Sequence, residues 1–218
     1  LCNAAVAVYI YSLVPEFMLR FIAWLLIHSV YRLQQNGLEN IPQDGPAILV
    51  CNHVSFVDPI VIAAASRRPI RFVMDHRIYR LPVINFIFRH MHTIPIAPAR
   101  EDAAMMAAAF EEVAHALAEG ELVAIFPEGR ITDNGEIYPF RPGVQQIVGR
   151  TPVAVIPMAL QGLWGSFFSR KDGPAMSNPL RAGLFARIAL SVGPAVAPAA
   201  ATPEHLREIV AALRGDWR

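Results

Sequence analysis

Charged residues and cysteines are both scarce in this 218-residue sequence. Charged side chains make up 17% of the residues, against ~25% in ordinary soluble domains, while 54% are hydrophobic, which excludes an intrinsically disordered chain. Two cysteines are too few for a small secreted fold held by several disulfides. The net charge of +1 gives no whole-chain argument for nucleic-acid binding. The composition therefore predicts a globular protein that contacts a membrane.

Long hydrophobic runs are also missing, because none reaches the ~18–20 residues of a membrane-spanning helix. Residues 1–15 carry no charge and residues 21–31 are nearly all apolar, and no basic region of a signal peptide precedes them. Three interpretations stay open: a helix pair broken at Pro15 in the membrane interface, the tail of a truncated spanning helix, or a core hairpin. Membrane contact is favoured because the segment carries residues typical of an interface. These are Trp24, Tyr31 and Arg32.

Short apolar runs alternate with helix-like runs along the rest of the chain. The expected strands are 47–51, 71–74, 93–96, 122–126, 153–160 and 188–192. The expected helices are 58–65, 81–88, 102–119, 143–148 and one that begins at Pro203. This alternation predicts an α/β sandwich with a mixed, largely parallel sheet flanked by helices. We expect an apolar helical segment over 1–33, a main domain over 34–195, and a linker with a carboxy-terminal amphipathic helix over 196–218.

The first candidate motif is Asn-His-Val-Ser-Phe-Val-Asp at residues 52–58, between a strand end and a helix start, where α/β folds place ligands. His53 is suited to proton transfer near neutral pH, and Asp58 can fold back to orient its ring. Asn52 and Ser55 can brace the turn through bonds to the backbone. The alternative is that His53 is an ordinary loop histidine and that Asp58 only caps the next helix.

The second candidate motif is Phe126-Pro127-Glu128-Gly129-Arg130, which also follows an expected strand. Gly129 permits a positive φ or a close approach to a ligand. Arg130 carries a planar fork that suits phosphate or carboxylate, and Glu128 can orient Arg130 or a substrate hydroxyl. The alternative is a surface turn with a solvated Glu–Arg pair.

The two motifs together resemble the glycerophospholipid acyltransferase family, which includes the lysophosphatidic acid acyltransferases. The resemblance rests on N-H-x-S-F-x-D followed, about seventy residues later, by F-P-E-G-R, and on Val155-Ile156-Pro157-Met158, which is similar to a further family block. It covers about residues 35–195. The sequence F-P-E-G-R-I-T with Thr93-Ile94-Pro95-Ile96 is most similar to the acyltransferase domain of bacterial 2-acylglycerophosphoethanolamine acyltransferases, which are fusion proteins. A fusion would also explain a chain that starts at Leu1 without a methionine.

The resemblance implies a glycerol-3-phosphate acyltransferase-like sandwich and an O-acyltransferase activity. His53, oriented by Asp58, would take the proton from a free hydroxyl of a lysophospholipid, either lysophosphatidic acid or lysophosphatidylethanolamine. The hydroxyl oxygen would then attack the thioester of acyl-CoA or acyl-carrier protein. No metal or prosthetic group is implied, and the expected partners are membrane lipid and the membrane surface, at the cytoplasmic face of the bacterial inner membrane. The implied substrate-binding residues are Asn52, Ser55, Arg100, Phe126, Pro127, Glu128, Gly129, Arg130 and Pro157.

The sequence departs from the family at one position. The family usually carries an arginine shortly after the strand that matches residues 93–96, whereas this chain has Ala97-Pro98 there. Arg100 is the expected substitute for holding the phosphate.

Arginines gather between residues 67 and 100, with only Asp75 among them as an acidic residue. They are Arg67, Arg68, Arg71, Arg77, Arg80, Arg89 and Arg100. The favoured interpretation is a basic face for anionic headgroups or acidic acyl-carrier protein, and the alternative is a solvated face. No nucleic-acid-binding motif accompanies the run.

Two other functions stay open beside the acyltransferase. In a thioesterase, water would replace the acceptor hydroxyl, and in a catalytically silent module the same scaffold would only bind lipid. Cys51 as a thiolate nucleophile and a metal site at His90 and His92 are weaker interpretations, because a buried core cysteine is commoner and no further ligands stand at a recognised spacing.

Overall fold

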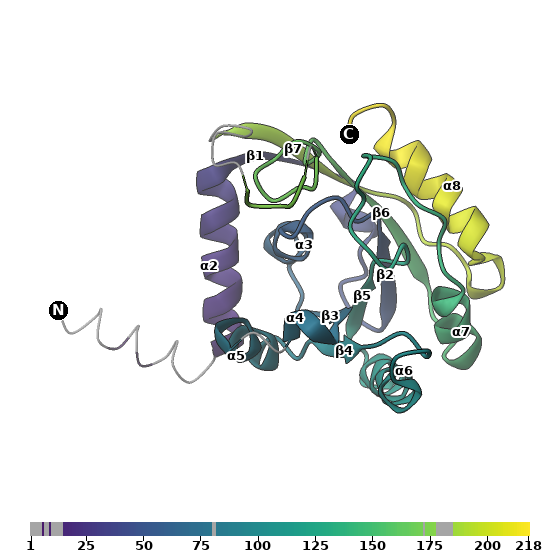
Figure 1. The fold of residues 1–218 in the computed structure, drawn as a ribbon. Coiled ribbons are helices and arrows are strands. Elements are labelled where there is room, and N and C mark those ends of the chain that lie inside the picture. The colour runs from purple at the N-terminus through teal and green to yellow at the C-terminus, as the bar shows by residue number, and fades with distance from the viewer. Residues whose placement is uncertain (1–5, 7–8, 10–14, 80–81, 172, 178–184) are drawn as a thin grey trace.

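The computed structural model describes the chain apart from residues 1–5, 7–8, 10–14, 80–81, 172 and 178–184 (Figure 1). Its helices are α2 (Pro15–Val30), α3 (Asp58–Ala65), α4 (His76–Tyr79), α5 (Pro82–His90), α6 (Ala103–Ala118), α7 (Gly143–Arg150) and α8 (Pro203–Arg214). Its strands are β1 (Tyr31–Asn36), β2 (Ala47–Cys51), β3 (Ile70–Asp75), β4 (Ile94–Ile96), β5 (Leu122–Ile125), β6 (Val155–Gln161) and β7 (Ala186–Val192). Two short 3₁₀ turns, η1 (Leu38–Asn40) and η2 (Pro198–Ala200), complete the described elements.

The described strands form one seven-stranded sheet in the order β1-β7-β6-β2-β5-β3-β4. Neighbouring strands are parallel except for β6 and β7, which are antiparallel, so β1 and β7 run against the other five. The carboxyl ends of β2 to β6 therefore lie along one edge of the sheet. Both predicted motifs follow strands that end there, and β2 and β5 are direct neighbours.

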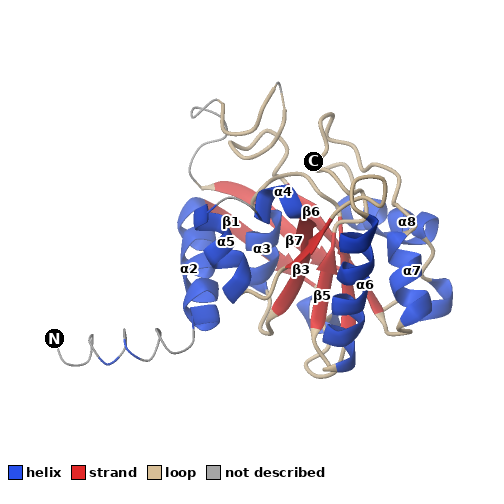
Figure 2. Ribbon diagram, turned by 60° about the horizontal axis from the view of Figure 1, so that its bottom comes forward, coloured by secondary structure: helices blue, strands red, loops and turns tan. Residues whose placement is uncertain are grey.

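Helices cover both faces of the sheet, as Figure 2 shows. One core cluster joins α2 and α3 to residues such as Leu49, Ala124 and Ile156, and the other joins α6, α7 and α8 to their strand neighbours such as Val50 and Val123. Because successive strand residues point to opposite faces, a central strand that is covered on both faces must be apolar throughout. The short runs that predicted β2 and β5 are buried along their whole length for this reason.

The α/β architecture with a mixed, largely parallel sheet agrees with the sequence prediction. Helix α6 begins after Asp102, whose side chain accepts a hydrogen bond from the Met105 N–H at 2.8 Å. Helix α8 is capped in the same way by Thr202, with Pro203 in its first turn. Capping by short polar side chains explains why these two helix starts can be placed from sequence.

The boundary expected at residue 33 is wrong, because α2 ends at Val30 and β1 begins at Tyr31 as an edge strand of the same sheet. Tyr31, expected at a membrane interface, is instead buried in the core at 5% exposure. Strand β1 has a polar sequence, and tertiary pairing with β7 rather than an apolar pattern makes it a strand. The expected linker before α8 also pairs with the sheet, because Val196 bridges Val155.

Helix α2 packs along α3 and presents the rest of its surface outward. No helix in the described ranges combines the length and hydropathy that crossing a membrane requires. The first half of the predicted helix pair, before Pro15, lies almost entirely outside the described residues. Trp24 is exposed, in line with the interfacial position expected for it.

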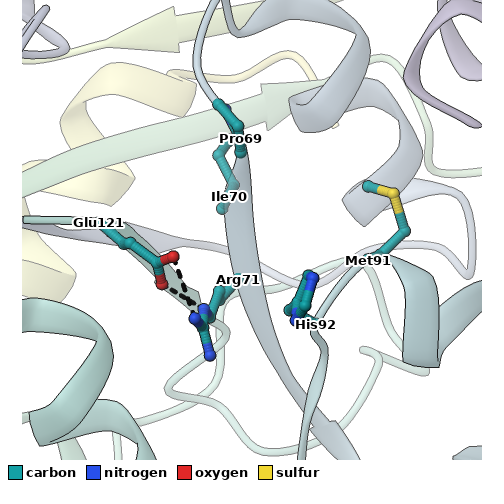
Figure 3. A pocket seen from close by; sticks show the side chains of 6 residues that line it. All are labelled: Pro69, Ile70, Arg71, Met91, His92 and Glu121. Atoms are coloured by element: carbon teal, nitrogen blue, oxygen red, sulfur yellow. Dashed lines mark hydrogen bonds and ion pairs between the residues drawn. The ribbon is translucent and has the colours of Figure 1, made fainter. Parts of the chain in front are cut away.

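The arginine run does not form one basic face. The Arg68 guanidinium donates to the carbonyls of Pro42, Gly45 and Gly120, and it thereby ties three turns together. Arg71 pairs with acidic side chains on and after α6, and Figure 3 shows it with Glu121 beside β3, across the strand from His92. Both arginines lie toward the amino ends of the parallel strands, at the edge opposite the two motifs. Arg80, also counted in the run, lies outside the described residues.

Candidate active site

The first motif forms the turn between β2 and α3. The His53 Nδ1 and the Asp58 Oδ2 are 2.9 Å apart. The Asp58 side chain is completely buried, whereas 19% of the His53 side chain is exposed. The two residues therefore form a dyad with its carboxylate inside the protein and its imidazole at the surface.

The Asp58 carboxylate turns back over the preceding loop. Its Oδ2 also accepts hydrogen bonds from the N–H groups of Val54 and Ser55, at 2.6 and 2.9 Å. The expectation that Asp58 caps α3 with its side chain is wrong, because α3 begins at Asp58 itself and no side-chain cap bond is made. Backbone donors fix the carboxylate in place, and the carboxylate fixes the His53 ring.

Asn52 and Ser55 hold the turn from inside the protein. The Asn52 side chain exchanges two hydrogen bonds with the backbone of Leu160 on β6, at 2.8 and 3.1 Å. The Ser55 hydroxyl accepts a bond from the N–H of Val57 at 3.3 Å, as the sequence predicted for a local brace. Both side chains are buried and already bonded, so they position the turn and do not face a substrate.

Glu128 connects the second motif to the first through the backbone. Its Oε1 accepts from the His53 N–H and its Oε2 from the Tyr138 N–H, both at 2.7 Å. The expectation that Glu128 orients Arg130 or a substrate hydroxyl is not met, because both oxygens are occupied and the side chain is buried. Sequence could not reveal this contact, since the bonded groups are backbone atoms of two distant loops.

Burial also changes the acidity of Glu128. Desolvation raises its pKa from an ordinary 4.5 to about 7, and the nearby negative charge of Asp58 adds to the rise. The two backbone hydrogen bonds and the positive charge of Arg207 act in the opposite direction. A charged group is stabilised less by the protein interior than by water, which explains the direction. Glu128 therefore changes its charge near neutral pH while it holds the His53 loop.

Phe126 and Pro127 shape the wall beside His53. The rings of His53 and Phe126 are stacked, with centroids 4.2 Å apart and planes inclined by 19°. The Pro127 carbonyl accepts a hydrogen bond from the N–H of Arg141 at 2.9 Å, and Pro127 itself is buried. Thr132 closes the cluster, because its N–H donates to the His53 carbonyl at 2.9 Å. The imidazole is thus held by a carboxylate at one nitrogen and by an aromatic ring on one face.

Gly129 and Arg130 lie at the exposed tip of the second motif. Gly129 has a φ of +67°, and a Cβ built on it would lie 2.5 Å from the Arg141 Cζ. The positive φ favours glycine here, and a side chain would also displace the Arg141 guanidinium that crosses the turn. The Arg130 guanidinium lies over the Tyr138 ring, 4.1 Å from its centroid. Arg141 is a residue that the sequence analysis missed.

Arg100 and Pro157 lie outside the hydrogen-bonded cluster that the two motifs form. Arg100 is exposed in the loop after β4, and two strands separate β4 from β2. No hydrogen bond or ion pair joins it to a described residue of either motif. Pro157 is buried inside β6 opposite Val50, and its carbonyl accepts from the N–H of Gly193 at 2.8 Å. It lies on the sheet face that packs against α8, so it supports the core.

The chemical environment of Cys51 excludes a thiolate nucleophile. The residue is a buried free cysteine, and desolvation raises its pKa well above the ordinary thiol value, with the charge of Asp58 adding to the rise. A neutral thiol in the core is a poor nucleophile. Within the described ranges, no three His, Cys, Asp or Glu side chains gather in a group that could hold a metal ion.

The arrangement is suited to activating a hydroxyl that belongs to another molecule. With Nδ1 bonded to Asp58, the His53 Nε2 is the ring nitrogen left to act as a base, and it has no hydrogen-bond partner among the described residues. The neighbouring serine, Ser55, is completely buried and cannot serve as an enzyme nucleophile. A base without an adjacent nucleophile must act on a substrate.

The chain is similar to known acyltransferases over most of its length. A family model described as Acyltransferase matches residues 32–161. The chain is 29% identical over 148 residues to a chloroplastic 1-acyl-sn-glycerol-3-phosphate acyltransferase of Arabidopsis thaliana, covering 67% of this chain and 41% of the relative. It is 27% identical over 124 residues to a 1-acyl-sn-glycerol-3-phosphate acyltransferase of Borreliella burgdorferi, covering 57% and 49%. The chain thus spans less than half of the length of these relatives.

The fold is similar to that of a solved structure. The crystal structure of the 1-acyl-sn-glycerophosphate acyltransferase of Thermotoga maritima matches 89% of this chain and 74% of its own, with a TM-score of 0.68 and 21% identity. That match supports the α/β architecture described above. The family indicated by the two motifs is confirmed by the family model, which includes both motifs and more than half of the chain. The chain belongs to the Acyltransferase family.

Proposed function

We propose that this protein is an O-acyltransferase that transfers a fatty acyl group from a thioester to the free hydroxyl of a lysophospholipid. The observation that carries the proposal is the His53–Asp58 pair, bonded at 2.9 Å and set beside a loop that ends in exposed Arg130. The relatives named above act on 1-acyl-sn-glycerol-3-phosphate by their names, which favours a phosphate-bearing acceptor of the lysophosphatidic acid type. Lysophosphatidylethanolamine is the second acceptor to test.

In the proposed reaction, His53 Nε2 takes the proton from the acceptor hydroxyl as its oxygen attacks the thioester carbonyl. The Asp58 carboxylate accepts the Nδ1–H bond and stabilises the imidazolium that forms. The tetrahedral intermediate then collapses, the C–S bond breaks, and the imidazolium returns its proton to the departing thiolate. The protein supplies the base and its orientation, and no acyl-enzyme is required.

Arg130 is the proposed contact for the acceptor phosphate. Its guanidinium lies over Tyr138, and no described residue forms an ion pair with it. An arginine held flat against an aromatic ring keeps its donors available and loses little freedom on binding. Arg141, which crosses Gly129 beside it, adds a second positive charge at the same loop.

The acyl donor is proposed to be acyl-CoA or acyl-carrier protein, the thioesters that the sequence resemblance implies. The test is thiol release from palmitoyl-CoA and palmitoyl-acyl-carrier protein, each with and without lysophosphatidic acid or lysophosphatidylethanolamine. We expect acceptor-dependent release that is lost in His53→Ala. His115→Ala is the matched control, because His115 lies exposed on α6. Acceptor-independent release would indicate a thioesterase, and acceptor binding without turnover of either donor would indicate a lipid-binding module.

Helix α2 is the proposed membrane contact. One surface of this helix exposes large apolar side chains to between 40% and 61%, which a fully solvated helix would not favour. They are Phe17, Phe21, Ile22, Trp24, Leu25 and Leu26. We further propose that the protein acts at the cytoplasmic face of a bacterial inner membrane, where lysophospholipid and acyl thioesters meet.

Vesicle flotation tests the membrane contact. The protein should float with vesicles of phosphatidylethanolamine and phosphatidylglycerol, and the double variant Phe21→Glu, Leu25→Glu should remain in the soluble fraction. Ala107→Glu is the control, because Ala107 is exposed on α6, away from α2. If the double variant floats as the wild type does, α2 is not the membrane contact.

A further inference from the structure

The loop that joins β6 to β7 is attached to the catalytic turn. The Phe168 carbonyl accepts a hydrogen bond from the Phe56 N–H at 3.3 Å, and Ser169 forms an antiparallel bridge with Ser55. In the view of Figure 1 this loop lies above α3, whose first residue is Asp58. A segment more than a hundred residues from the first motif therefore forms one wall of the same site. The Acyltransferase family model ends at residue 161, before this loop.

A broad pocket that is open to the surface lies between this loop, Phe56 of the first motif and the segment after the second motif. Its volume is about 720 Å³, and it is lined by Phe56 of the first motif, by Asp133 just after the second, and by Arg170, Pro174 and Met176 of the β6–β7 loop. Volumes of roughly 300–1,000 Å³ are typical of small-molecule and cofactor sites. The lining combines apolar walls with one cation and one carboxylate. Such a lining suits an elongated ligand that has both apolar and hydrogen-bonding groups along its length and carries an anion.

Arg170 provides the positive charge of this pocket. Its guanidinium carbon lies 5.8 Å from the centroid of the Phe56 ring, and no residue that the structure describes forms an ion pair with it. Arginines elsewhere in the described chain, such as Arg71, Arg77 and Arg150, are paired with glutamates. A guanidinium that is supported by a ring but lacks a carboxylate partner is available to a phosphate.

The proposed reaction brings two substrates to His53, and each carries a phosphate. Arg130, after β5, is assigned to the acceptor phosphate. Arg170 belongs to a different loop, which joins the catalytic turn at Phe56 and Ser55, and we assign it to the second anion. The two possible donors share one group, because both CoA and acyl-carrier protein carry the acyl chain on 4′-phosphopantetheine.

We propose that the pocket between Phe56 and the β6–β7 loop binds the 4′-phosphopantetheine arm of the acyl donor, with Arg170 contacting its phosphate. The inference rests on the proposed acyltransferase function. The Phe56 ring, Pro174 and Met176 contact the apolar parts of the arm. Asp133, whose Oδ1 already accepts a hydrogen bond from the Tyr138 hydroxyl, has its second oxygen to accept from the amide N–H groups of the arm. The thioester then extends from the pocket toward His53.

Two donors that differ only in the 4′-phosphate, with palmitoyl-CoA as a third, test the contact kinetically. Palmitoyl-pantetheine, palmitoyl-4′-phosphopantetheine and palmitoyl-CoA are compared at saturating lysophosphatidic acid, in the full chain and in Arg170→Ala. The variant should lower kcat/KM by roughly tenfold or more for the two phosphorylated donors, the loss expected for one charge-assisted contact, and leave palmitoyl-pantetheine unchanged. Arg170→Lys should restore part of the loss. Arg67→Ala, an exposed arginine at the opposite edge of the sheet, is the matched control.

A binding measurement separates this inference from the proposed function. Calorimetric titration of the wild type should show 4′-phosphopantetheine binding at least roughly fivefold more tightly than pantetheine, and Arg170→Ala should remove that difference. If the difference is present without any turnover, the pocket assignment stands and the acyltransferase proposal fails. If turnover occurs and the two compounds bind equally to the wild type, the pocket assignment is overturned.

Two further outcomes would also overturn the inference. An equal loss of kcat/KM for all three donors would show that Arg170 only supports the loop. A raised KM for lysophosphatidic acid, with donor KM unchanged, would show that Arg170 serves the acceptor. The same assay is run with palmitoyl-acyl-carrier protein as donor. If Arg170→Ala slows transfer from one donor more than from the other, that donor is the source of the phosphopantetheine arm.

Discussion

Glu128 binds the backbone of His53 and not the imidazole ring, because the His53 N–H donates to the Glu128 Oε1 at 2.7 Å. The same carboxylate accepts from Tyr138 through its other oxygen, so one buried side chain sets the spacing of two loops. A residue that looks like a substrate ligand in the sequence thus acts as a positioning residue. The raised pKa of its buried carboxylate can also be tested.

Stability should depend on pH through Glu128. Its pKa is about 7 in the folded protein and 4.5 ordinarily, so between these values the folded state retains a proton that the unfolded chain has released. The Glu128 contribution to the free energy of unfolding therefore falls as pH rises from 4.5 to about 7 and is constant above that. Urea denaturation of wild type and Glu128→Gln at pH 5 and pH 8 measures this. The wild type should gain stability relative to the variant at pH 5, and an unchanged difference would contradict the assigned pKa.

Asp58→Asn should abolish most of the activity and preserve the fold. The amide can still accept from the N–H groups of Val54 and Ser55, but it carries no charge to stabilise an imidazolium at His53. A loss in kcat on the order of 10⁴-fold is expected, as for the aspartate of a Ser-His-Asp triad, with little change in KM. Loss of acyl transfer in a variant whose circular dichroism spectrum is unchanged would agree with this prediction. Retention of more than a tenth of the wild-type kcat would exclude Asp58 from this role.

Gly129→Ala should destabilise the second motif. The new Cβ would meet the Arg141 guanidinium at 2.5 Å, and alanine would be held at a φ of +67°. We expect a loss of about 1–2 kcal/mol in the free energy of unfolding, together with reduced activity. Gly149→Ala is the matched control, because Gly149 lies in α7 with nothing within 4 Å of its Cβ position, and it should be neutral or stabilising. Equal effects of the two substitutions would contradict the geometry at Gly129.

Asn52→Ala should lower stability more than an exposed asparagine does. It removes the two hydrogen bonds that Asn52 makes with the buried N–H and C=O of Leu160 at the end of β6. The expected loss is about 2–3 kcal/mol, measured by urea denaturation. Asn36→Ala, on the exposed edge strand β1, is the control and should change stability little. If both variants unfold at the same urea concentration, Asn52 does not brace the turn.

Local patterns were sufficient for the elements whose residues specify their own conformation. The runs that became β2 and β5 are apolar on both faces, and Asp102 and Thr202 begin their helices with side-chain caps. Strand β1 was missed because its polar sequence becomes a strand only by pairing with β7, which lies about 150 residues away. A separation of more than a hundred residues likewise hid the contact of Arg170 with Phe56 from any local interpretation.

The sequence by itself determined the α/β class and the two motif loops, and it indicated His53 and Asp58 as the proposed base and its carboxylate. These depend on residue type and on spacing within a few positions of the chain. Only the tertiary structure decided that Glu128 binds two backbones, that Arg100 lies two strands away, and that Arg170 stands beside Phe56. Contacts of that kind join backbone atoms and side chains from different strands, and the order of strands in the sheet is set by burial of the whole core. No single stretch of sequence carries that information.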